Sequence, residues 1–112
     1  MNEKQIKQLR KILSLSQEKF ARVICVTLVT VSRWERGISK PSGLAEDKLL
    51  LINSLAERVK AVFGTIAKKW LESPNDNLKG KKPIKVLETF EGIEAVNTIL
   101  NKESKTQEKK EK

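Results

Sequence analysis

The apolar positions near the N-terminus follow the spacing of two short α-helices. The first helix is predicted over residues 2–13, where one face carries residues spaced i, i+3, i+4 and i+7. That face consists of Ile6, Leu9, Arg10 and Leu13. A second helix is predicted to begin after Ser16, whose side chain can cap its first turn. Its inward face consists of Phe20, Ala21 and Ile24. The pattern therefore predicts two helices separated by a brief turn.

The stretch RVICVTLVTVSRWERG, residues 22–37, favours two different structures. Seven of the nine residues between positions 23 and 31 are β-branched, which by propensity favours a buried strand. A strand would bury Arg33 whenever it buries Val31, because both would lie on one face. A helix capped by Thr27 separates them, and Gly37 can end it in a left-handed conformation. Its inward face would hold Val31, Trp34 and Glu35. Burial of the two apolar side chains contributes about 2 to 3 kcal/mol each, against a few tenths of a kcal/mol per β-branched residue. We therefore predict a third helix.

The second half is predicted to contain one long helix and several short ones. The long helix follows a loop at residues 38–43 and ends at Gly64. Its apolar face is predicted to consist of Leu51, Ile52, Leu55, Val59, Val62 and Phe63. Proline and glycine then divide the chain into short helical segments at 65–73, 83–89 and 91–102. Residues 101–112 contain no apolar side chain and should form a solvated helical extension or a flexible, disordered tail. The predicted fold class is all-α.

Composition excludes most catalytic chemistry. The chain has no histidine and Cys25 is its only cysteine, which excludes zinc sites, internal disulfides and histidine-based acid–base catalysis. A length of 112 residues suits one domain with a small companion better than a large catalytic core. We therefore predict a protein that is not an enzyme and has no cofactor, no metal and no small-molecule substrate. Without a signal peptide or an apolar membrane span, it is expected in the cytoplasm with no membrane partner.

The net charge of +9 is concentrated in the first half of the chain. Residues 1–60 carry twelve Lys or Arg and six acidic residues, a net charge of +6. Residues 61–100 carry a net charge of +1, and the last twelve residues carry +2. A basic excess of this kind suits a polyanionic partner, of which nucleic acid is the first candidate.

The segment LRKILSLSQEKFARVICVTLVTVSRWERGISKPS, residues 9–42, resembles the Xre or Cro/cI family of helix-turn-helix regulators. The resemblance rests on Leu-Arg in the first helix, Ser-Gln at the start of the second, Ala21, and VSRWERG at the end of the third. It implies a lambda-repressor-like DNA-binding domain over residues 1–60 that binds operator DNA as a homodimer, with its third helix in the major groove. Cys25 departs from the family, which usually has glycine at that turn.

Side chains around the third helix are predicted to contact operator DNA. Arg33 is the best candidate for a base contact, because a guanidinium can donate two hydrogen bonds to guanine. Leu28 and Val29 could pack on thymine methyl groups or, alternatively, on another protein. Backbone N–H groups at the start of the second helix could bind a phosphate. The predicted DNA-contacting residues are Ser16, Gln17, Thr27, Leu28, Val29, Thr30, Ser32, Arg33, Arg36 and Lys40.

Arg10 and Glu35 are predicted to form a structural ion pair between the first and third helices. Each is a charged residue on an otherwise apolar face. Burial of either one alone would cost several kcal/mol, so the two should meet. The helix-turn-helix resemblance implies the same pair.

The segment FGTIAKKWLESPNDNLKGKKPIKVLETFEGIEAVNTIL, residues 63–100, resembles the toxin-binding domain of Xre/MbcA/ParS-type antitoxins. The residues that carry the resemblance are Trp70, Leu71, Pro74, Asn75, Leu78, Gly80, Pro83, Leu87, Glu91, Gly92, Val96 and Leu100. It implies a small helical toxin-binding domain over residues 61–100, and an antitoxin of a type II toxin–antitoxin system. That antitoxin would neutralise a RES-domain toxin, an enzyme acting on NAD, and repress its own operon.

Most apolar residues of this second segment are expected to form the core rather than to contact the toxin. The predicted toxin contacts are therefore polar residues in the loop and at the start of the tail, residues 101–112. They are Asn75, Lys79, Asn101 and Lys102. Two alternatives stay open. The chain could be a stand-alone regulator whose second half only mediates dimerisation, or a toxin inhibitor that has lost DNA binding.

Overall fold

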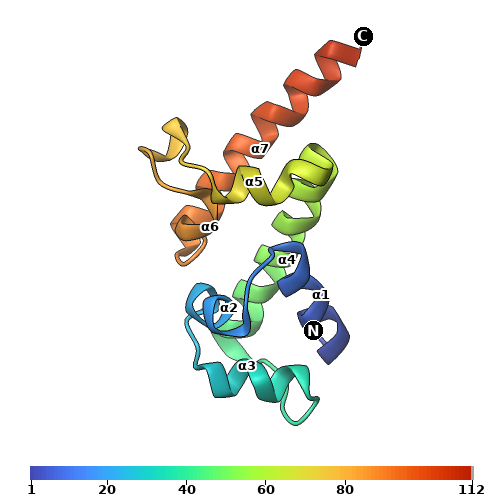
Figure 1. The fold of residues 1–112 in the computed structure, drawn as a ribbon, viewed down its shortest axis with the longest axis vertical. Helices are drawn as coiled ribbons and strands as arrows, with labels where there is room; N and C mark the ends of the chain where they lie inside the picture. The colour runs from blue at the N-terminus through green and yellow to red at the C-terminus, as the bar shows by residue number, and fades with distance from the viewer. Residues whose placement is uncertain (112) are drawn as a thin grey trace.

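The computed structural model describes the backbone of residues 1–111 and the side chains of residues 1–103. Its elements, in chain order, are α1 (Glu3–Ile12), α2 (Gln17–Ile24), α3 (Leu28–Glu35), α4 (Gly43–Phe63), η1 (Gly64–Ile66), α5 (Ala67–Glu72), η2 (Asp76–Leu78), α6 (Pro83–Val86) and α7 (Phe90–Glu111). Figure 1 shows α1, α2 and α3 around the first part of α4, with α5 and α7 beside its second part. The all-α prediction is confirmed. Within the described residues, β-type pairing is limited to an isolated bridge between Asn75 and Lys81.

The first three helices begin at capping side chains. Asn2, Ser16 and Thr27 each accept a hydrogen bond from a backbone N–H in the first turn of α1, α2 and α3. The residues predicted to face inward are buried: Ile6, Leu9, Leu13, Phe20, Ala21, Ile24, Val31, Trp34 and Glu35. The β-branched stretch therefore forms the end of α2, a turn at residues 25–27 and α3, and packing has overridden its strand propensity.

The central helix, α4, contacts both halves of the chain. It ends at Gly64, as predicted, and this glycine has a φ of +55°. The prediction that Leu51 lies on the buried face is wrong, since its side chain is 46% exposed. The buried face passes instead through Lys48, Leu49, Ile52, Leu55, Ala56 and Val59. At 3.6 residues per turn, Leu51 lies about 200° around the helix from Leu49, so both cannot face the core.

The C-terminal half is built on the second part of α4. α7 packs along this part of α4, and its side chains Ile93, Val96 and Leu100 are buried. Arg58 of α4 donates hydrogen bonds to the side chains of Asn97 and Asn101 on α7. These contacts fix the first half of α7 to the central helix.

The two halves share one hydrophobic core. Apolar residues from α1, α2 and α3 and those from α5, α6 and α7 belong to a single cluster around α4. The boundary predicted between residues 60 and 61 lies inside α4, so this helix contributes to both halves. The division into domains at these residues stays a prediction.

The last helix extends beyond the rest of the molecule (Figure 1). α7 continues through Glu111. Of the two structures expected for the tail, residues 101–111 therefore adopt the helical extension. Lys112 lies outside the described residues. Among the helices of residues 1–111, none combines the length and the apolar character needed to cross a membrane.

Candidate DNA-binding and partner-binding surfaces

The turn between α2 and α3 depends on a left-handed residue. Cys25 ends α2 with φ 68° and ψ 44°. Its N–H and that of Val26 donate to the carbonyls of Arg22 and Ala21, which closes the end of the helix. A side chain in this conformation costs on the order of 1 kcal/mol relative to glycine. The turn nevertheless sets α3 across α2, and Figure 1 shows α3 at the far end of the molecule from α7.

The predicted pair of Arg10 and Glu35 is present and connects α1 to α3. Two guanidinium nitrogens of Arg10 donate to the two carboxylate oxygens of Glu35, each at 2.8 Å, and a third contact reaches the carbonyl of Leu15 at 3.1 Å. The side chain of Glu35 is 3% exposed and that of Arg10 is 22% exposed. The guanidinium therefore supplies the counter-charge of a buried carboxylate.

The environment of Glu35 keeps this carboxyl group ionised. Burial by itself would raise its pKa, but hydrogen bonds from Arg10 and Gln17 and the charges of Arg10 and Lys7 lower it further than burial raises it. The net effect is a pKa below the ordinary value. Gln17 is the first residue of α2 and Glu35 is the last residue of α3, so these contacts hold the start of α2 against the end of α3.

α3 exposes a surface that is both apolar and basic. Leu28 and Val29 are 47% and 57% exposed, and Arg33 and Arg36 are also exposed. Lys40 is exposed in the loop that follows α3. This arrangement provides two guanidinium groups beside apolar side chains, which suits contacts to base edges, phosphates and methyl groups.

Several of the hydroxyl groups predicted to contact DNA have structural roles. Ser16 accepts from the N–H of Lys19 as the cap of α2. Thr27 caps α3, and its hydroxyl lies 2.8 Å from that of Thr30. Ser32 and Gln17 are half-buried. The exposed members of the predicted set without a capping role are therefore Leu28, Val29, Arg33, Arg36 and Lys40.

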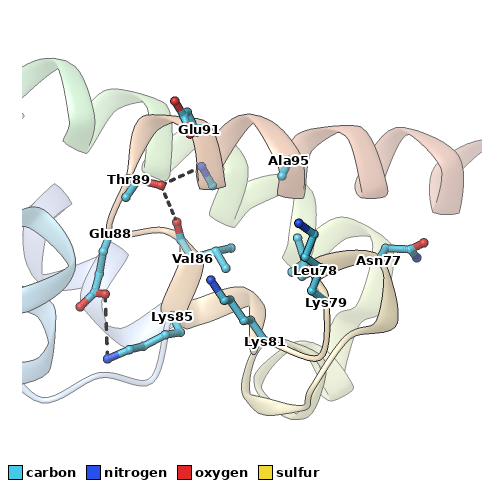
Figure 2. Close-up of a pocket in the computed structure, with 11 residues that line it drawn as sticks. Asn77, Leu78, Lys79, Lys81, Lys85, Val86, Glu88, Thr89, Glu91 and Ala95 are labelled. Atoms are coloured by element: carbon cyan, nitrogen blue, oxygen red, sulfur yellow. Dashed lines mark hydrogen bonds and ion pairs between the residues drawn. The ribbon is translucent and has the colours of Figure 1, made fainter.

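A cleft of about 720 Å³ lies in the C-terminal half (Figure 2). Lys79 and Lys81 come from the loop around η2, Lys85 comes from α6, and Glu91 belongs to the first turn of α7 on the opposite side. The apolar part of the lining consists of Leu78, Val86, Gly92 and Ala95. Lys85 lies 3.9 Å from Glu88, the only ion pair involving these lysines among the described residues. The cleft therefore combines an apolar lining with a cationic rim.

One wall of the cleft depends on a glycine. Gly92 approaches the carbonyl of Val86 so closely that a Cβ at this position would lie 1.7 Å from the oxygen. Its N–H donates to the hydroxyl of Thr89 at 2.9 Å, which caps the start of α7. Residue 92 must therefore be glycine for the α6–α7 turn to close against α7.

The four predicted toxin contacts do not form one site. Lys79 lines the cleft and adopts φ +58°. Asn75 instead shapes the loop, since its side chain accepts from the N–H of Asn77 and its backbone pairs with Lys81. Asn101 accepts a hydrogen bond from Arg58, and Lys102 is exposed on α7. The cleft residues Val86, Glu88, Thr89 and Gly92 were not predicted as a site. The sequence signal that could have indicated this turn is the dipeptide Glu91-Gly92, which is part of the resemblance to the toxin-binding domain.

Comparison with known proteins agrees with both halves of this description. The helix-turn-helix family profile matches residues 6–44. The profile described as the antitoxin Xre/MbcA/ParS C-terminal toxin-binding domain matches residues 58–104. A chain in the crystal structure of the M. tuberculosis MbcT–MbcA toxin–antitoxin complex has a TM-score of 0.74 and 20% identity, covering 93% of this chain and 94% of that chain. At this identity the match shows a shared fold. A comparison with curated proteins gives no match.

Proposed function

We propose that this chain, which has the two domains of an Xre/MbcA/ParS-type antitoxin, neutralises a protein toxin and represses its own operon. The observation that carries the proposal is the match of residues 58–104 to an antitoxin toxin-binding domain, which follows a helix-turn-helix match at residues 6–44. Neither matched family is an enzyme family. The chain would therefore act by binding, in the cytoplasm, where both DNA and a toxic enzyme are accessible.

The toxin is proposed to be a RES-domain enzyme acting on NAD. This follows from the resemblance of residues 63–100 to antitoxins of that class, and the related fold in a toxin–antitoxin complex supports it. The lysine-rimmed cleft is the proposed contact surface, because its apolar lining and cationic rim suit an apolar segment flanked by acidic side chains. Of the toxin contacts expected from sequence, Lys79 lies at this cleft, and Asn75, Asn101 and Lys102 would be peripheral.

The toxin proposal is tested by co-expression. A tagged chain is co-expressed with a RES-domain protein encoded beside its gene, and copurification and residual NAD consumption are measured. The pair Lys79→Glu and Lys81→Glu should reduce copurification, because it reverses the charge of the rim. The matched control is Lys68→Glu with Lys69→Glu, which changes the same charge at two exposed residues of α5 that do not line the cleft. Equal effects of both pairs would contradict a role for the cleft.

The DNA target is proposed to be the operator of the same operon, bound by a homodimer through α3. The exposed arginines of α3 and the net charge of +6 in residues 1–60 support this proposal. Arg33→Ala should weaken binding to a duplex of the upstream region by about 1 to 3 kcal/mol and relax its sequence preference. Lys68→Ala, at the other end of the molecule, should leave the binding unchanged. Binding that does not weaken as salt increases would contradict the proposal.

A second candidate function is toxin inhibition without operator binding. The observation that favours it is the exposure of Leu28 and Val29 on the surface where a DNA-binding helix commonly has polar residues. Under this alternative, Leu28→Ser and Val29→Ser would weaken the association of this chain with another protein. DNA binding would be undetectable in the wild type and in both variants. The third possibility, a stand-alone regulator, predicts DNA binding but no copurifying toxin.

A further inference from the structure

Among the side chains that the structure describes, Lys48 is a buried lysine with no carboxylate partner. Its residue is 5% exposed, and it shares the buried face of α4 with Leu49 and Ile52. Among the described residues, the other buried charged residue is Glu35, which is paired with Arg10. Lysine is almost never buried without a specific partner, because removal of an ammonium group from water is costly. Lys48 therefore requires an account of its own.

The ammonium group of Lys48 joins three segments of the chain. It donates to the backbone carbonyl of Glu88 at 2.5 Å and to the sulfur of Cys25 at 3.4 Å. The thiol of Cys25 itself lies 3.7 Å from the same Glu88 carbonyl. The three groups thus form a closed set of contacts between the α2–α3 turn, the central helix and the α6–α7 turn.

Each of the two turns held by Lys48 determines the geometry of a binding surface. Cys25 is the left-handed residue that sets α3 against α2. Glu88 lies between Val86 and Thr89 in the turn that forms a wall of the cleft (Figure 2). A displacement of the Glu88 carbonyl would leave the ammonium group with only the sulfur of Cys25 as a partner, so Lys48 would follow the carbonyl. Movement of one turn is therefore transmitted to the other.

A purely structural role would be met by an apolar residue at this position. The surrounding side chains include Ile24, Val26, Ala45 and Phe90, which line the same hollow as Lys48. Methionine has nearly the same length and would pack there without the cost of a buried charge. A partly buried polar contact of this kind selects one arrangement of its partners more strongly than apolar packing does, which suits a junction between two binding surfaces.

We infer that Lys48 couples the α6–α7 turn to the α2–α3 turn, so that the state of the C-terminal half sets the DNA affinity of α3. The inference rests on the proposed function, and it adds a positioning residue that contacts neither partner. An occupant of the cleft would touch the same turn through Val86 and Thr89. Its binding would change DNA affinity, and DNA would change its affinity by the same factor.

The test perturbs one turn and measures the other. Thr89→Val removes the hydroxyl that caps α7 and loosens the α6–α7 turn without changing any residue of the helix-turn-helix. Lys48→Met removes the charged connection and nearly keeps the length of the side chain, and it leaves only the weaker contact of the Cys25 thiol with the Glu88 carbonyl. The matched control is Thr98→Val, which removes a hydroxyl bonded within α7, away from the turn. The full chain and these variants are titrated with a labelled duplex of the upstream DNA and with a shuffled duplex of the same composition.

A double-mutant comparison gives the expected result. Thr89→Val should weaken binding to the upstream duplex at least about fivefold in the Lys48 protein and less than about twofold in the Lys48→Met protein. Thr98→Val should have no effect in either background. An equal loss on Thr89→Val with and without Lys48 would overturn the inference.

Hydrogen exchange provides a second measurement that does not depend on DNA. The Val26 N–H is bonded to the Ala21 carbonyl and closes the end of α2 at the α2–α3 turn. Its exchange is followed in wild type, Thr89→Val, Lys48→Met and the double variant. Thr89→Val should accelerate it only when Lys48 is present. If wild-type protein failed to distinguish the two duplexes, the proposed operator function would fail. The exchange data would still support or overturn the coupling.

Discussion

Replacement of Arg10 by alanine should destabilise the protein more than replacement of its partner Glu35. The two side chains are 22% and 3% exposed, so their losses have different consequences. Arg10→Ala leaves a buried carboxylate without its counter-charge, which costs about 3 to 5 kcal/mol. Glu35→Ala leaves a guanidinium that can turn toward water, so the cost is mainly the lost charged hydrogen bonds, about 2 kcal/mol.

These magnitudes translate into separable thermal shifts. For a small domain, 1 kcal/mol moves Tm by about 4 to 8 °C, so Arg10→Ala should lower it by at least about 12 °C. The double variant Arg10→Ala/Glu35→Ala should be less destabilised than the sum of the single variants by about 2 kcal/mol or more. Urea unfolding followed by circular dichroism measures all four free energies under one set of conditions.

The control is an exposed charged residue on α1, the helix that carries Arg10. Lys11→Ala removes a cation from the helix that carries Arg10 and should change the free energy of unfolding by less than about 0.5 kcal/mol. Additive effects of Arg10→Ala and Glu35→Ala would refute the reasoning. So would a larger loss for Glu35→Ala than for Arg10→Ala.

Three further predictions follow from the same structure. The pKa of Glu35 lies below its ordinary value of about 4.3, so the stability that its charge contributes is present above that pH and is lost as pH falls through the folded pKa. Urea unfolding at several pH values should therefore show the difference in free energy of unfolding between wild type and Glu35→Gln becoming smaller in that acidic range. Gly92→Ala should lower the free energy of unfolding by about 2 kcal/mol or more, since its Cβ would meet a backbone carbonyl, whereas Gly80→Ala, with open space around it, should cost about 1 kcal/mol. Leu49→Asn should destabilise the chain by several kcal/mol in the same assay and Leu51→Asn by about 0.5 kcal/mol or less, because only the first is buried; equal effects would contradict the observed face of α4.

The sequence predicted those features that leave a local signature. Capping residues mark the starts of α2 and α3, and Gly37 and Gly64 mark helix ends by their freedom at positive φ. The Arg10–Glu35 pair could be predicted because each residue interrupts an apolar helical face. The error at Leu51 has the opposite origin. In LLLIN, consecutive apolar residues satisfy several helical faces at once, so only the packing partners decide which face is buried.

Lys48 and Gly92 illustrate the two kinds of information that sequence reasoning missed. Lys48 interrupts the face that contains Leu49 and Ile52, as Arg10 interrupts its own, and this signal was available. Its partners were not, because a backbone carbonyl and a thiol distant in sequence have no charge that predicts the pairing. Gly92 sits inside a helix without a positive φ, so its need for a missing Cβ depends entirely on how Val86 approaches.

The unbroken course of α4 through both halves has a geometric consequence for the complexes proposed above. Each residue of an α-helix adds about 1.5 Å of length and 100° of rotation. Insertion of a single residue near the middle of Gly43–Phe63 would therefore turn the cleft about one quarter of a circle relative to α3. In the proposed complex, the winding of this one helix would set the direction in which the toxin projects from the DNA. It would thereby decide which neighbouring complexes on the same duplex can contact one another.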